Sequence, residues 1–117
     1  KTETDYLTDG PGYNHVLRNN ISYAPRSAGN DIRNFDSARC TIDHNSFLND
    51  AFAISDEDFL SLDTAQLIAP RQPDGSLPEI RFMHLKPNSK LVDKGIDVGL
   101  PFNGKAPDPG CFETKKK

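Results

Sequence analysis

Groups of carboxylate and amide side chains are the first places where this chain could bind a metal ion. Asn30, Asp31, Asn34 and Asp36 offer oxygen ligands within one short segment, as a calcium site would require. Their spacing differs from that of an EF-hand and only two of them are carboxylates, so we interpret them as turn formers. The acidic run Asp56–Asp58 is better explained by a favourable interaction with a helix N-terminus. Neither group predicts a metal site.

The basic and nucleophilic side chains likewise form no catalytic pattern. Lys86, Lys90 and Lys94 are spaced so that a helix would place them on one face, but Pro87 and Gly95 interrupt such a helix. We therefore interpret these lysines as solvated charges. The three histidines match no metal or nucleophile motif, and they are His15, His44 and His84. The sequence predicts no catalytic residue and no metal ligand within the chain.

An internal repeat organises the first half of the chain. A shift of 25 positions (45 − 20) aligns Leu17 with Ile42 and Asn20 with Asn45. A repeat of this length suits one coil of a parallel β-helix, in which short strands stack in register. We expect Leu17 and Ile42 to point inward, and the two asparagines to stack at a corner in the left-handed backbone conformation.

The second half of the chain predicts a cap instead of further coils. We expect residues 1–54 to form the last coils and residues 55–117 to cap them, within one structural domain. A capping box between Ser55 and Asp58 predicts a short helix that carries Phe59, Leu60 and Leu62. The other expected elements are a helical turn at 64–69 capped by Asp63, a strand at 82–85, a turn from Ser89 to Gly95, and an extended strap from Ile96.

Composition and charge exclude several classes of function. Only 35% of the residues are hydrophobic, and 8 Gly and 9 Pro predict a thin core with many turns. The net charge is −3, and the only basic block of the sequence is the terminal Lys115–Lys117. This shortage of clustered Lys and Arg argues against a nucleic-acid partner. No apolar run approaches the roughly 18 residues that span a membrane, so no membrane partner is expected.

Three motifs in the second half carry a family resemblance. Residues 58–63 read DFLSLD, residues 70–78 read PRQPDGSLP, and residues 104–113 read GKAPDPGCFE. In this order they resemble the C-terminal end of the secreted pectate lyases of polysaccharide lyase family 9. The chain departs from the family pattern at Lys105, Pro109 and Cys111.

The resemblance implies both a fold and a function. The implied fold is all-β: the C-terminal coils of a right-handed parallel β-helix, with short helices and an irregular C-terminal cap. The implied function is that of a coil-and-cap segment in a secreted lyase that cleaves uronate polymers by β-elimination. Family members resembled here use a calcium ion held by an Asp cluster and a Lys base, and the resemblance places both upstream of Lys1.

Sugar binding is the one function that a cap segment could retain by itself. Tyr13, His15, Arg18 and Asn19 begin a coil whose outer face would continue or flank the substrate-binding sheet, where Arg can bind a carboxylate through two hydrogen bonds. The expected ligand is an acidic polysaccharide similar to polygalacturonate. An alternative is that Arg18 pairs with Asp43 and Tyr13 packs in a corner.

Other interpretations stay open at this stage. The chain could be a non-catalytic β-helix module of a cell-surface protein that binds glycans or has a structural role, or it could be complete and active by itself. Its exposed first coil predicts contact with upstream coils or with a second copy. Cys40 and Cys111 could form a disulfide, but Ala stands at the second position in the family pattern, which favours two buried thiols.

Overall fold

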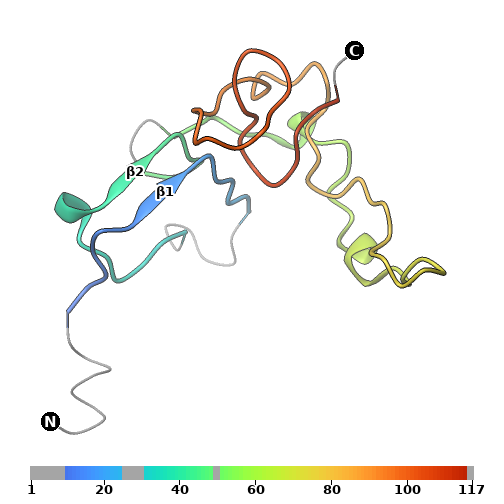
Figure 1. The fold of residues 1–117 in the computed structure, drawn as a ribbon, viewed down its shortest axis with the longest axis horizontal. Helices are drawn as coiled ribbons and strands as arrows, with labels where there is room; N and C mark the ends of the chain where they lie inside the picture. The colour runs from blue at the N-terminus through green and yellow to red at the C-terminus, as the bar shows by residue number, and fades with distance from the viewer. Residues whose placement is uncertain (1–9, 25–30, 49–50, 116–117) are drawn as a thin grey trace, which may run out of the picture.

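The computed structural model describes residues 10–24, 31–48 and 51–115, and it begins with two stacked coils (Figure 1). Strands β1 (Val16–Arg18) and β2 (Thr41–Asp43) pair in parallel, with Leu17 opposite Ile42. The register of 25 residues confirms the predicted repeat. Ile42 is buried at 6% exposure, and Leu17 is half-buried.

The asparagine ladder forms, although its backbone conformation differs from the prediction. The Asn45 side chain is fully buried, and its Oδ1 accepts hydrogen bonds from both the backbone N–H and Nδ2 of Asn20, each at 2.9 Å. Its Nδ2 donates to the carbonyl of Leu17 at 2.8 Å. The left-handed residues are Asn19 and His44, each one position earlier than we expected. The turn at these residues lets the following asparagine point inward and bond across the coils.

The second coil is longer than the first before its strand. Gly12 bridges Phe35 at an offset of 23, whereas β1 and β2 pair at an offset of 25. The two additional residues fall at the 3₁₀ turn η1 (Ser37–Arg39), where the Asp36 carboxylate accepts the backbone N–H of Ala38 at 3.1 Å. A capped turn thus absorbs the insertion without disturbing the strand register.

The main core lies between the coils and the cap. Phe59, Leu85 and Leu91 are buried together there, at 2–4% exposure. The side chains packed against them come from both halves of the chain and are Ile21, Tyr23, Phe52, Ile54, Leu62 and Met83. The small size of this cluster agrees with the thin core that the composition predicts.

Two short 3₁₀ turns follow the coils, η2 (Asp56–Asp58) and η3 (Thr64–Ile68). The capping box at η2 is present, and Asp63 caps η3 by accepting the N–H of Ala65 at 3.0 Å, so both start signals are confirmed. The longer helix expected through Leu62 is wrong, because η2 ends before Phe59. That residue instead forms an antiparallel bridge with Leu85, which places its ring in the core.

The strand expected at 82–85 is also wrong. Phe82 and Leu85 form only isolated bridges, to Ser61 and Phe59, and Met83 between them has a positive φ of 59°. This left-handed residue turns the backbone, so a continuous ladder cannot form. The turn expected after Ser89 is present, with the Ser89 hydroxyl accepting the N–H of Leu91 at 3.1 Å.

The strap after Gly95 returns to the first coil and fastens there. Asn19 donates from Nδ2 to the Ile96 carbonyl and accepts the Ile96 N–H at Oδ1, both at 2.8 Å. Its own carbonyl accepts the N–H of Gly110 at 2.7 Å. Further along, the buried Asp108 carboxylate accepts the N–H groups of Asp93 and Thr114, both at 2.7 Å. The irregular strap is therefore held by side-chain bonds to its backbone.

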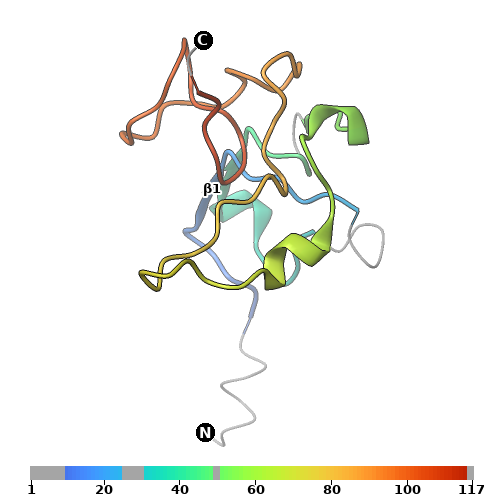
Figure 2. The same cartoon turned by 90° about the vertical axis from the view of Figure 1, so that its right-hand side faces the viewer.

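An arm formed by residues 63–81 extends away from this body. In Figure 1 the arm lies on the side of β1 that faces away from β2, and Figure 2 shows it below the strap. The described chain is correspondingly elongated, with principal extents of 54 × 35 × 29 Å. No helix in the described segments is long and apolar enough to cross a membrane.

The cysteines are free, but they are not the two buried thiols that we expected. Cys40 is half-buried, with its Sγ 3.7 Å from the carbonyl oxygen of Gly12, and Cys111 is exposed on the strap. Cys111 follows Gly110, which sits against Ile21 at the end of the first coil. The backbone turn at Gly110 leaves the next side chain facing outward.

Candidate functional site

A charged cluster occupies the carboxyl ends of β1 and β2. Arg18 donates two hydrogen bonds to the Asp43 carboxylate, at 3.0 and 3.2 Å, and the His44 Nδ1 lies 2.8 Å from the same carboxylate. Hydrogen bonds from His44 and then Arg18 lower the pKa of Asp43. The structure therefore contains the Arg18–Asp43 pair that we left open as an alternative, in a half-exposed position where its strength is modest.

Tyr13 lies at the other end of the strands and pairs with a residue that the sequence analysis missed. The Arg39 guanidinium lies 4.0 Å from the centroid of the Tyr13 ring, and it also bonds Asp36 at 2.7 Å. This hydrogen bond is the main reason why the pKa of Asp36 is lowered. Tyr13 is 50% exposed, so it does not pack into a corner. The 25-residue repeat, which places Arg39 opposite Asn14, could have revealed this neighbour.

The four predicted sugar-binding residues thus lie in different surroundings. Tyr13 and His15 are exposed before β1, and Arg18 is half-exposed at its end. Asn19 has both ends of its amide bonded to the Ile96 backbone. Its side chain therefore holds the strap, whereas the other three remain on the outer surface of the first coil.

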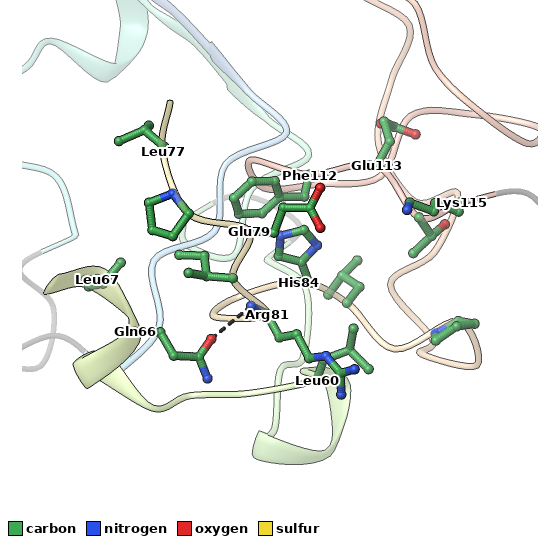
Figure 3. A pocket seen from close by; sticks show the side chains of 15 residues that line it. Leu60, Gln66, Leu67, Leu77, Glu79, Arg81, His84, Phe112, Glu113 and Lys115 are labelled. Carbon is green, nitrogen blue, oxygen red and sulfur yellow. Dashed lines mark hydrogen bonds between the residues drawn. The ribbon is translucent and has the colours of Figure 1, made fainter. Parts of the chain in front are cut away.

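A hollow lies between the arm and the end of the strap (Figure 3). It has a volume of about 1000 Å³. Its apolar wall includes Leu60, Leu67 and Leu77, which are 45%, 57% and 70% exposed. Its polar residues come from both sides and include Glu79, Arg81, His84, Glu113 and Lys115. We call this hollow the arm groove.

One ring pair closes the inner side of the arm groove. His84 stacks on Phe112, with ring centroids 3.7 Å apart and planes inclined by 16°. Burial, and then the charge of Lys115, lower the pKa of His84. Gln66 positions the opposite wall, because its Oε1 accepts the backbone N–H groups of Arg81 and Phe82 at 2.9 and 3.0 Å. The groove is formed by segments that lie far apart in the sequence, so no local motif predicts it.

Calcium binding is not supported by the side chains that the structure describes. Residues 10–24, 31–48 and 51–115 contain no group of three or more His, Cys, Asp or Glu side chains that could hold a metal ion. Asn30 of the candidate loop lies outside the described residues. The buried acid Asp58 is instead bonded by Ser89 at 2.8 Å and Lys90 at 3.1 Å. These residues do not fit a calcium site.

Comparison with known proteins identifies the chain's relatives. It is 37% identical over 103 residues to proteins named Pectate lyase L from Dickeya dadantii (strain 3937) and Dickeya chrysanthemi, which covers 87% of this chain. It also matches the crystal structure of pectate lyase Pel9A with a TM-score of 0.69 and 31% identity over 91% of the chain. This chain is homologous to the β-helical pectate lyases. No family model matches it.

The pectate lyase relationship confirms the all-β, parallel β-helix fold and supports the prediction of a C-terminal portion of a family 9 protein. The chain spans 22% of the length of the curated relatives and 27% of the Pel9A chain. A solved structure named rhamnogalacturonan lyase is similar over a shorter stretch, with a TM-score of 0.57 and 33% identity over 67% of this chain. The match covers 18% of the rhamnogalacturonan lyase chain.

Proposed function

We propose that this chain is the C-terminal coil-and-cap segment of a secreted, calcium-dependent pectate-type lyase. The observation that carries the proposal is the 37% identity to Pectate lyase L over 87% of the chain, which corresponds to 22% of that relative. The alternative of a non-catalytic cell-surface module is not favoured, because the similar proteins named above are all lyases.

The proposed reaction is β-elimination on a uronate polymer. A base removes the proton alpha to the uronate carboxylate, and the glycosidic oxygen leaves, so a cation is needed to stabilise the charge that develops on the carboxylate. The described residues offer no carboxylate cluster for such a cation. By resemblance to the family 9 lyases, we propose that the calcium site and the lysine base lie in coils that precede Lys1, and we derive no step of the reaction through residues of this chain.

The proposed role of this chain is to close one end of the β-helix. Coils of a β-helix are buried only by their neighbours, so the last coil needs a cover. Residues 1–54 would supply the last coils and residues 55–117 the cover. The hydrogen bonds that join Asn19 to Ile96 and Gly110 support this division, because they tie the strap to the first coil.

A second part of the proposal concerns the substrate. Tyr13, His15 and Arg18 would contact an acidic polysaccharide from the outer surface of the first coil, and Asn19 would contribute by fixing the corner beside them. Arg18 is bonded to Asp43, so a uronate carboxylate would have to share or replace that partner. Replacing Arg18 with Ala in the full-length enzyme should raise KM for polygalacturonate more than it lowers kcat, whereas a purely structural role would lower thermal stability and leave KM unchanged.

The proposal can be tested on the gene that encodes the full-length protein. The reading frame before Lys1 should encode an Asp cluster and a Lys in preceding coils. Replacing that Lys with Ala should abolish lyase activity while secretion and folding persist. A reading frame without these residues, or an active Lys→Ala variant, would contradict the assignment of catalysis to the upstream coils.

A further inference from the structure

The edge of β1 that faces away from β2 is unpaired within the described residues. β1 and β2 form a two-stranded sheet, so β1 has one hydrogen-bonded neighbour there. Val16 on β1 is 66% exposed, and Asn20 is exposed although its ladder partner Asn45 is fully buried. An open strand edge beside an exposed apolar side chain is a surface that a further strand can cover.

The arm borders the space beside this open edge. Figure 1 places residues 63–81 on the side of β1 that faces away from β2. Leu67 and Leu77 on the arm are exposed and line the arm groove, as Figure 3 shows. Exposed apolar side chains that gather in one groove mark an interaction surface.

We propose that the arm groove receives the coil that immediately precedes the first coil of this chain in the full-length protein. That coil would stack on the open edge of β1, and apolar side chains on its surface would pack against Leu67 and Leu77. The arm would thus hold the side of the β-helix as a clasp, in addition to the cover provided by the strap. This inference rests on the proposed function, because it requires the longer polypeptide.

Two observations favour this occupant over a second copy of the chain. The relatives are much longer, since the chain covers only 22% of Pectate lyase L and 27% of Pel9A, so further polypeptide exists in them to fill the space. The 25-residue spacing of β1 and β2 also defines where another parallel strand would pair. A preceding coil of the same polypeptide would supply the missing chain and continue the parallel strand pairing. Its covalent linkage would also make the contact intramolecular.

Cysteine labelling of the full-length protein tests the clasp. In a background without native cysteines, Leu67→Cys and Leu77→Cys are compared with Leu100→Cys, whose native leucine is 69% exposed on the strap, away from the groove. The exposures of Leu67 and Leu77, 57% and 70%, would give similar rates if the groove were empty. We expect a water-soluble maleimide to label both arm positions at least ~10-fold more slowly than position 100, because labelling requires local opening. All three should react equally in denaturant.

Equal labelling of the three folded variants would overturn the proposal. Protection that disappears on dilution, together with a dimer in sedimentation, would also overturn it by identifying a second copy as the occupant. A second comparison is independent of cysteine chemistry: Leu77→Asp should lower the thermal midpoint of the full-length protein, and Leu100→Asp should leave it unchanged. An inactive but protected protein would refute the proposed lyase function alone, and the protection would still support the clasp.

Discussion

Replacing Asp58 with Ala should strongly destabilise the cap. Its carboxylate is 4% exposed and accepts hydrogen bonds from the Ser89 hydroxyl at 2.8 Å, the Ser55 N–H at 2.9 Å and Lys90 Nζ at 3.1 Å. A hydrogen bond to a charged group contributes about 1.5–3 kcal/mol, and a donor left buried without a partner adds a desolvation cost. Lys90 is 54% exposed and can return to water, so we expect a total loss of about 3 kcal/mol in the free energy of unfolding.

The pH dependence of this loss has a defined sign. Burial by itself raises the pKa of Asp58, but hydrogen bonds from Ser55, Ser89 and Lys90 outweigh it and lower the pKa below 3.8. The ionised carboxylate therefore stabilises the folded state above pH 3.8, and this contribution is lost as the pH falls through the lower folded-state pKa. The stability difference between the wild type and Asp58→Asn should shrink over the same range.

Urea unfolding of the full-length protein, followed at several pH values, measures both effects. Asp74→Ala is the matched control, because Asp74 bonds to Ser76 within its own exposed turn and its replacement should change stability little. If Asp58→Ala remained within about 0.5 kcal/mol of the wild type at neutral pH, the reasoning about the buried carboxylate would be refuted.

Four further substitutions test other parts of the structure. Asn45→Ala should lower the free energy of unfolding by about 2 kcal/mol, because it removes the fully buried Asn45 amide and its hydrogen bonds to the Leu17 carbonyl and the Asn20 N–H; an unchanged urea midpoint would contradict this. Gly75→Ala should lower the free energy of unfolding by about 1 kcal/mol, because Gly75 has a positive φ. Gly104→Ala should lower it further, because the added Cβ would also collide with the Asp93 carboxylate. Equal urea midpoints for the two variants would contradict the collision. Burial holds the pKa of His84 in the folded state below 6.5, so wild-type stability should fall as the pH drops through 6.5 and below. His84→Phe should remove this fall in thermal scans from pH 7.5 to 5. An unaltered pH profile in the variant would contradict the prediction.

The coils could be predicted from sequence because a repeat records contacts that recur along the chain. The alignment of Leu17 with Ile42 and of Asn20 with Asn45 predicts both the strand register and the ladder that the structure contains. The left-handed backbone conformation was predicted at Asn20 and Asn45, one residue later than Asn19 and His44, where it occurs. The reason is that asparagine suits both the turn residue and the next residue, whose side chain forms the ladder hydrogen bond. Local preference alone does not separate these two roles.

The cap was less predictable because its conformation depends on contacts between distant segments. Ser55 and Asp63 signalled their turns correctly, since capping acts within three residues. The early end of η2 depends on Phe59 bridging Leu85, and the turn at Met83 depends on the same packing. The arm groove was missed for this reason too, because its walls come from residues 60–87 and 112–115.

The most direct test of the central claim compares the 117-residue chain with the full-length protein in a lyase assay. Both are incubated with polygalacturonate and calcium, and the ultraviolet absorbance of the unsaturated product is followed. We predict that absorbance rises with the full-length protein and stops rising when a chelator is added, whereas the chain alone gives a flat trace. Activity of the chain alone, or a flat trace from the folded full-length protein, would contradict the account.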